Sequence, residues 1–250
     1  MIKTFLPDGF DAVAEYENMV ARTAAAFADQ NGVILGISGG KDSSVAAKLF
    51  ADAIGPDKVV GVIMPNGEMR DKELAGRICR YLGIRHFTAD ISAVYREELE
   101  LLSNIAPMPA AAKVNILPRI RMTTLYALAQ TMGLRVIGTG NRSEATVGYC
   151  TKWGDMASDF NPLASYTCSE VIEIGRRVLP EWIIDNDPAD GLWGKTDEEN
   201  LGFTYYELDR FIRLGERGKN YPKIEQRIAA SRHKREPIPH IEPLYRGSRL

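Results

Sequence analysis

Short apolar segments recur along the first 140 residues and are separated by longer amphipathic stretches. VILGI and VVGVIM are continuously apolar, as expected for strands that are buried on both faces. RHFTADI is a weaker strand, and VIGTG has the same apolar character as the first two. The pattern therefore predicts four strands, at residues 33–37, 59–64, 85–91 and 136–140.

Helix signals fill the intervals between these strands. From 11 to 29, apolar residues such as Tyr16, Val20 and Phe27 recur near one face of a helix. Gly83 and Gly133 stand where helices end, and Pro118 suits the first turn of a helix. The pattern predicts helices at 11–29, 42–54, 71–82, 92–102 and 118–132.

Strands that alternate with helices predict an α/β fold with a doubly wound parallel sheet, whose ligands bind beyond the carboxyl ends of the strands. The alternation lapses from 146 to 167, and three capping-box patterns follow, beginning at Thr167, Thr196 and Thr204. They predict a helical C-terminal third. A length of 250 residues suits one domain or two small ones, and we treat 1–250 as a single domain.

The segment from Gly36 to Ser44, GISGGKDSS, directly follows the first strand. Its glycines let backbone N–H groups approach an anion, its serines add hydroxyl donors, and the next helix presents its positive N-terminus. The spacing is neither that of a Walker A loop nor that of a dinucleotide GxGxxG loop. A phosphate loop is the stronger interpretation, and a Gly-Ser turn that merely caps a helix is the alternative.

This loop resembles the SGGxDS loop of the N-type ATP pyrophosphatases, which have an adenine nucleotide alpha-hydrolase-like fold. The segments NILPRIRM at 115–122 and GTGNRSEATVGYCTKWGDMASDFNPL at 138–163 resemble motifs of the NAD synthetases. Further similarity lies in GLWGKTDEENLGFTYYELD and in SRHKREP near the C-terminus. The chain is thus identified as a member of the ammonia-dependent NAD synthetase family.

The resemblance implies roles for individual positions. Asp42 and Glu144 match two carboxylates that bind Mg²⁺, and these are also the expected catalytic residues. The substrate deamido-NAD would be held by Arg119, Lys152, Asp159, His233 and Lys234. ATP would contact Gly36, Ile37, Ser38, Gly39, Gly40, Lys41, Asp42, Ser43, Thr139, Cys168 and Ala189.

Two positions depart from the family pattern. Cys168 stands where many relatives have a lysine that contacts ATP phosphate, and Ala189 stands where they have Ser or Thr. Both departures fall on the nucleotide side of the site. Lys41 lies inside the phosphate loop, so we hypothesise that it supplies the missing charge, with Lys195 or bulk Mg²⁺ as alternatives.

The resemblance further implies a reaction in which ATP adenylates deamido-NAD and ammonia then displaces AMP to give NAD. Use of glutamine would need an additional glutaminase domain, and the first predicted strand already begins near residue 33. We therefore expect free ammonia as the nitrogen source, Mg²⁺ as cofactor, and a homodimer.

Composition narrows the remaining alternatives. A net charge of −2 gives no electrostatic case for nucleic acid as a partner. The N-terminus does not look like a signal peptide, no apolar run suits a membrane helix, and three unpaired cysteines fit a reduced, cytoplasmic protein. Two other functions stay open: a tRNA-modifying or sulfur-transferring pyrophosphatase, which usually has cysteine pairs and a basic surface, and a nucleotide sensor without catalysis.

Overall fold

A parallel four-stranded sheet forms the centre of the protein in the computed structural model, which describes residues 3–67, 72–184 and 196–241. The strand order is β3-β2-β1-β4. Val33 of β1 lies opposite both Val59 and Arg135, and Ile63 of β2 lies opposite Thr88. The four strands are β1 (Val33–Gly36), β2 (Val59–Ile63), β3 (Arg85–Thr88) and β4 (Arg135–Val136).

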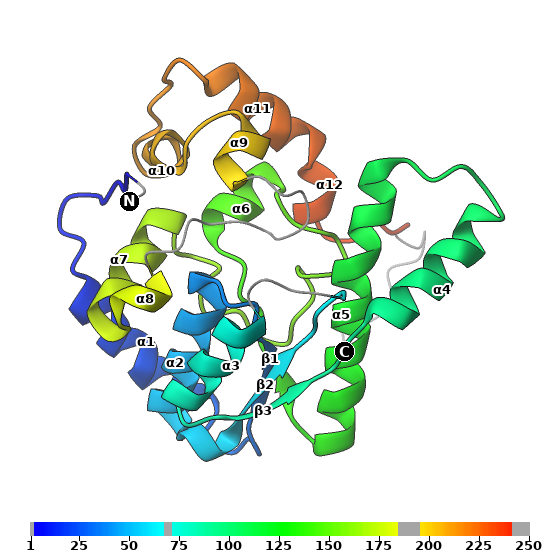
Figure 1. Ribbon diagram of the computed structural model, residues 1–250. Helices are drawn as coiled ribbons and strands as arrows, with labels where there is room; N and C mark the ends of the chain where they lie inside the picture. The colour runs from blue at the N-terminus through cyan, green and yellow to red at the C-terminus, as the bar shows by residue number, and fades with distance from the viewer. Residues whose placement is uncertain (1–2, 68–71, 185–195, 242–250) are drawn as a thin grey trace.

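Helices cover both faces of this sheet, so the predicted α/β fold class is confirmed (Figure 1). The N-terminal helices are α1 (Ala12–Ala26), α2 (Lys41–Ile54), α3 (Lys72–Tyr81), α4 (Ser92–Ser103), α5 (Ala110–Met132) and α6 (Arg142–Val147), with a 3₁₀ turn, η1 (Pro56–Lys58). The later ones are α7 (Cys168–Val178), α8 (Glu181–Ile184), α9 (Asp197–Leu201), α10 (Tyr205–Leu214), α11 (Tyr221–Ala230) and α12 (Arg232–Arg235).

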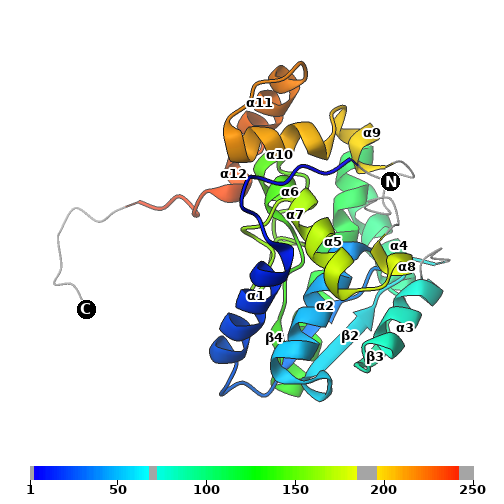
Figure 2. The same ribbon diagram turned by 90° about the vertical axis from the view of Figure 1, so that its left-hand side faces the viewer.

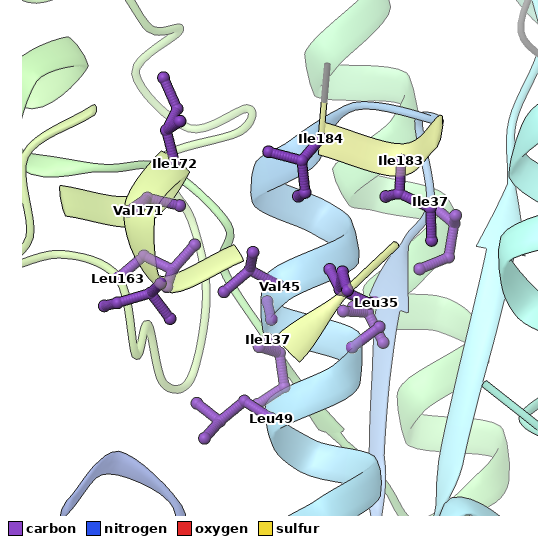
Figure 3. Packing of buried hydrophobic residues seen from close by; sticks show 14 of the residues in the cluster. Leu35, Ile37, Val45, Leu49, Ile137, Leu163, Val171, Ile172, Ile183 and Ile184 are labelled. Carbon is purple, nitrogen blue, oxygen red and sulfur yellow. The ribbon is translucent and has the colours of Figure 1, made fainter. Parts of the chain in front are cut away.

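Alternating side chains of the strands enter two separate hydrophobic clusters. Val33 and Leu35 of β1 pack into the larger cluster, together with residues of α1, α2, α3 and α7. Ile34 points the other way, into a smaller cluster with residues of α5. Figure 3 shows Leu35, Val45 and Ile184 among the side chains of the larger cluster. Burial on both faces explains why the strands read as continuous apolar runs.

The helix predicted to begin at Pro118 begins eight residues earlier, at Ala110, and this prediction was wrong. Pro118 lies inside α5, where its missing N–H and its ring normally disfavour a helix. Leu117, Met122 and Leu125 of the same helix are buried against the sheet, so tertiary packing outweighs the local signal. The predicted end at Gly133 is confirmed, because this residue adopts the left-handed conformation with φ +67°.

The helical C-terminal third is confirmed. The side chains of Thr167, Thr196 and Thr204 each cap a helix in a complete capping box, as their spacing to Glu170, Glu199 and Glu207 predicted. Figure 2 shows α9 to α12 gathered at one end of the molecule, beside α6 and α7. Among the described residues, the helices include none with the length and hydropathy needed to cross a membrane.

Candidate active site

The segment between β1 and α2 forms a tight loop at the carboxyl edge of the sheet. Gly39 has φ +92°, a conformation that side chains disfavour. The hydroxyl of Ser38 accepts a hydrogen bond from the backbone N–H of Gly40 at 3.1 Å and lies 3.2 Å from the hydroxyl of Ser43. These contacts fold the loop back over the first turn of α2.

The N-terminus of α2 is a candidate anion site. Gly40 is its N-cap residue, and no side chain from the described part of the protein caps this end. The first N–H groups of a helix have no partner within the helix and carry a partial positive charge. An ATP phosphate would therefore find backbone donors at Lys41, Asp42 and Ser43.

Asn141 connects the two carboxylates that were predicted to bind the metal ion. Its side-chain amide donates to Oδ1 of Asp42 at 3.4 Å, and its backbone N–H donates to Oε2 of Glu144 at 3.0 Å. Asn141 is fully buried and follows β4, whereas Asp42 follows β1. Burial raises the pKa of Glu144 well above its usual range, and the charge of Asp42 raises it further.

Lys41 adds a positive charge to this pair. Its side chain is only 5% exposed, and Nζ lies 2.7 Å from Oδ2 of Asp42. Burial lowers the pKa of Lys41, but the charge of Asp42 and the hydrogen bond to it outweigh this effect and raise it above its usual value. Cys168 is also fully buried, and burial is the main reason that the pKa of its thiol is raised.

A buried polar network fixes the N-terminus of α7 beside α6. The hydroxyl of Ser143 donates to Oδ1 of Asp209 at 2.5 Å and accepts from the backbone N–H of Cys168 at 2.9 Å. The other oxygen of Asp209 accepts from the N–H of Ser169 at 2.9 Å. Because Ser143 directly precedes Glu144, this network holds the second carboxylate in place.

A second group of predicted residues lies where α5, the segment after α6 and α12 meet. Nε of Arg119 donates to the backbone oxygen of Lys152 at 3.3 Å, and Nζ of Lys152 donates to the backbone oxygen of His233 at 2.6 Å. Lys234 donates to the backbone oxygens of Gly148 and Cys150. The structure thus brings Arg119, Lys152, His233 and Lys234 together.

Asp159 lies apart from this group, beside β4. Its Oδ2 accepts from the backbone N–H of Val136 at 2.8 Å, and its Oδ1 accepts from the hydroxyl of Tyr126 at 3.3 Å. Thr139 is half-buried in the segment that follows β4. Ala189 and Lys195 fall outside the described residues.

Sequence reasoning missed two residues of this region. One is Asn141, although the spacing Asn141-x-x-Glu144 is that of a capping box and could have revealed it. The other is Tyr205, which is buried and donates to Oδ2 of Asp197 at 3.1 Å. Burial raises the pKa of Tyr205, and the charge of Glu144 adds to this shift, so its hydroxyl stays protonated near the carboxylates. No local pattern marked Tyr205.

Comparison with known proteins agrees with this arrangement. Residues 13–248 match the family model described as NAD synthase. The chain belongs to the NAD synthase family. It is 38% identical over 222 residues to an NH(3)-dependent NAD(+) synthetase of Carboxydothermus hydrogenoformans, which covers 87% of this chain and 91% of that protein.

Two solved structures of related synthetases superimpose on the chain. The NMN synthetase from Francisella tularensis has a TM-score of 0.83 and 34% identity, covering 94% of this chain and 100% of its own. The NH3-dependent NAD synthetase from Campylobacter jejuni has a TM-score of 0.76 and 25% identity, with the same coverage. The family assignment made from the motifs is therefore confirmed, and an NAD synthase is a ligase that uses ATP.

Proposed function

We propose that the chain is an ammonia-dependent ligase that converts deamido-NAD to NAD at the expense of ATP. One observation carries this proposal beyond family membership: Asp42 and Glu144 meet at the phosphate loop through Asn141. A sensor without catalysis could bind Mg²⁺ and ATP in the same way, and pyrophosphate release is the measurement that separates it from a ligase. A pyrophosphatase that acts on tRNA is not favoured by any feature of the described residues.

Adenylation solves the chemical problem of the reaction, because a carboxylate is a poor target for ammonia. An oxygen of the nicotinate carboxylate bonds to the α-phosphorus of ATP, and the bond to the β-phosphate oxygen breaks to release pyrophosphate. The nitrogen of ammonia then bonds to the carboxyl carbon, loses a proton, and displaces AMP. The protein needs no nucleophile of its own, and its task is to position the reactants and to stabilise charge.

The residues at the phosphate loop fit a Mg²⁺ ion. Mg²⁺ prefers oxygen ligands and is usually bound through one or two carboxylates together with substrate phosphates and water. Asp42 and Glu144 supply two such carboxylates, and a divalent cation would favour the ionised form of Glu144, whose pKa is raised by burial and by the charge of Asp42. Bound there, Mg²⁺ would neutralise charge on the phosphoryl oxygens. The amides of α2 and the hydroxyls of Ser38 and Ser43 would hold the phosphates.

The second group of residues would hold the dinucleotide. Arg119 is exposed, and Lys152 and Lys234 bring two more cations to the same place, where His233 is also exposed. A dianionic dinucleotide with a free carboxylate needs such cations, since charge-assisted hydrogen bonds are the strong ones. Asp159 and Lys152 would bind the nicotinate end. We further propose that residues 1–250 form a single domain that acts as a homodimer.

A second candidate substrate is the mononucleotide of nicotinate. The observation that favours it is the similarity to the NMN synthetase from Francisella tularensis, whose structure superimposes with a TM-score of 0.83 over its whole chain. Adenylation and amination are the same for both substrates. They differ in whether the protein also binds the adenylate half of the dinucleotide.

Pyrophosphate release tests the proposal. We expect steady-state release to require ATP, ammonia and either deamido-NAD or nicotinate mononucleotide, because without ammonia release stops after one adenylate per site. The ratio of kcat/KM for the two nucleotides identifies the substrate. Equal release when both of these nucleotides are omitted would contradict the proposal. Detection of the amide product by chromatography separates synthesis from simple ATP hydrolysis.

A further inference from the structure

Lys41 occupies an unusual position for a lysine on a nucleotide loop. Its ammonium lies 2.7 Å from Oδ2 of Asp42, and the side chain is almost inaccessible to solvent. Lys48, two turns further along α2, shows the ordinary alternative. It pairs with Asp52 at 2.6 Å, and both side chains of that pair are partly exposed.

Both oxygens of Asp42 are engaged by neighbouring side chains. Oδ2 accepts from Lys41 at 2.7 Å, and Oδ1 accepts from Asn141 at 3.4 Å. Glu144 is engaged through Oε2 by the backbone of Asn141. A divalent cation that binds Asp42 must displace the ammonium from Oδ2, because two cations on one carboxylate repel each other strongly in a partly buried site.

We propose that Lys41 is a resident cation of the metal site, which neutralises Asp42 in the free enzyme, excludes the metal ion, and moves to the polyphosphate when ATP brings the metal in. The proposal rests on the proposed function, since it takes ATP as the nucleotide. It predicts that metal and nucleotide enter together, and that the metal ion alone binds weakly.

The side chain of Lys41 suits such an exchange of partners. A lysine is a compact point charge on a flexible four-carbon stem, so its ammonium moves without any change of the backbone. Its own backbone N–H lies in the first turn of α2, where phosphate oxygens would bind. The anion that replaces Asp42 as its partner is thus expected within reach of the side chain.

Mn²⁺ is the probe for a direct test, because electron paramagnetic resonance measures free Mn²⁺ without any turnover. In the absence of nucleotide, we expect Lys41→Met to bind Mn²⁺ at least about tenfold more tightly than the unaltered protein. In the presence of a non-hydrolysable ATP analogue, the same variant should bind the nucleotide more weakly. The matched control is Lys48→Met, which removes a lysine from the same helix and should change neither affinity.

The variant is expected to bind Mn²⁺ more tightly and the nucleotide more weakly. These opposite changes in affinity distinguish the proposal from a general effect of losing a charge. If Lys41→Met binds Mn²⁺ without nucleotide no more tightly than the unaltered protein, the proposal is wrong, even when pyrophosphate release remains normal. If the unaltered protein releases no pyrophosphate, the proposed function fails independently of the Mn²⁺ result. Should Lys41→Met fold poorly, Lys41→Gln keeps a polar side chain, and Mn²⁺ should then raise its melting temperature more than that of the unaltered protein.

Discussion

The side-chain amide of Asn141 donates a hydrogen bond to Asp42, a residue 99 positions away along the chain. Asn141 is also the N-cap of α6, and Glu144 completes its capping box. A single buried side chain therefore sets the start of a helix and aligns the two carboxylates that we assign to the metal ion. Its two roles have different consequences when the side chain is removed.

Replacing Asn141 by Ala should lower both stability and metal affinity. Loss of an N-cap typically destabilises a protein by about 0.5–2 kcal/mol. Loss of the contact to Asp42 frees that carboxylate to turn, so the Mg²⁺ concentration for half-maximal pyrophosphate release should rise several-fold. Thr204→Ala is the matched control, because Thr204 caps α10 in the same type of capping box. It should lower stability alone, and a similar rise in the Mg²⁺ requirement in both variants would contradict the role of Asn141.

Asp42→Asn should abolish adenylation while the fold remains intact. The substitution preserves size and removes the negative charge that a metal ion requires. Circular dichroism checks the fold, and pyrophosphate release checks the reaction. Asp57→Asn serves as the control, since Asp57 is an exposed carboxylate in η1, before β2. Unchanged turnover in Asp42→Asn would remove Asp42 from the metal site.

The sequence predicted four strands, their parallel arrangement and three capping boxes because each depends on local patterns, although β4 ends at Val136 and not at Gly140 as predicted. It placed the start of α5 incorrectly at Pro118, where burial of Leu117 and Met122 against the sheet decides the outcome. The burial of Lys41 was hidden, because it depends on segments that are far apart in the sequence: its side chain is only 5% exposed, and Cys168 of α7 lies close enough to act on it electrostatically. Such relationships arise only when β1, β4 and α7 come together.

Asp159→Ala should weaken deamido-NAD binding far more than ATP binding if its charge holds the nicotinate end. The structure makes Asp159→Asn a necessary companion, because Oδ2 of Asp159 also accepts from the backbone N–H of Val136. Asn keeps an acceptor for that N–H and removes only the charge. Isothermal titration should show the selective loss in both variants. Equal losses for both ligands, confined to the Ala variant, would instead assign Asp159 to supporting β4.

Asp209 should make the protein less stable as the pH rises from about 4 to about 6. Burial raises the pKa of this carboxyl from 3.8 to about 6, so the folded state binds its proton more tightly than the unfolded state does. Its contribution to stability is complete below pH 3.8 and is lost as the pH rises through 6. A shift of this size corresponds to about 3 kcal/mol.

Comparison with Asp209→Asn isolates this effect from the other carboxylates. The difference in unfolding free energy, unaltered protein minus variant, should fall across that pH range in urea titrations. A flat or rising difference would show that the hydrogen bonds from Ser143 and Ser169 keep Asp209 ionised in the folded protein.

Lys41 and Cys168 provide the most demanding prediction, because their effects should not add. Lys41→Gln should raise the ATP concentration needed for half-maximal activity, since it removes the one ammonium that the described residues place on Asp42. Cys168→Lys alone should destabilise the protein. It adds a second ammonium at a fully buried position where the charge of Lys41 already acts.

Combining the two substitutions should bring the ATP concentration for half-maximal activity back toward that of the unaltered protein. With Lys41 replaced, an ammonium at position 168 would meet the same carboxylates without a competing cation, and it would reach the phosphates from α7 instead of α2. Interaction energies between neighbouring residues are commonly about 0.5–3 kcal/mol, so the double variant should differ measurably from the sum of the single variants. Two double-mutant cycles measure this difference, one from the melting temperatures and one from the apparent KM for ATP. If Lys41→Gln leaves the KM for ATP unchanged, Lys41 does not compensate for Cys168.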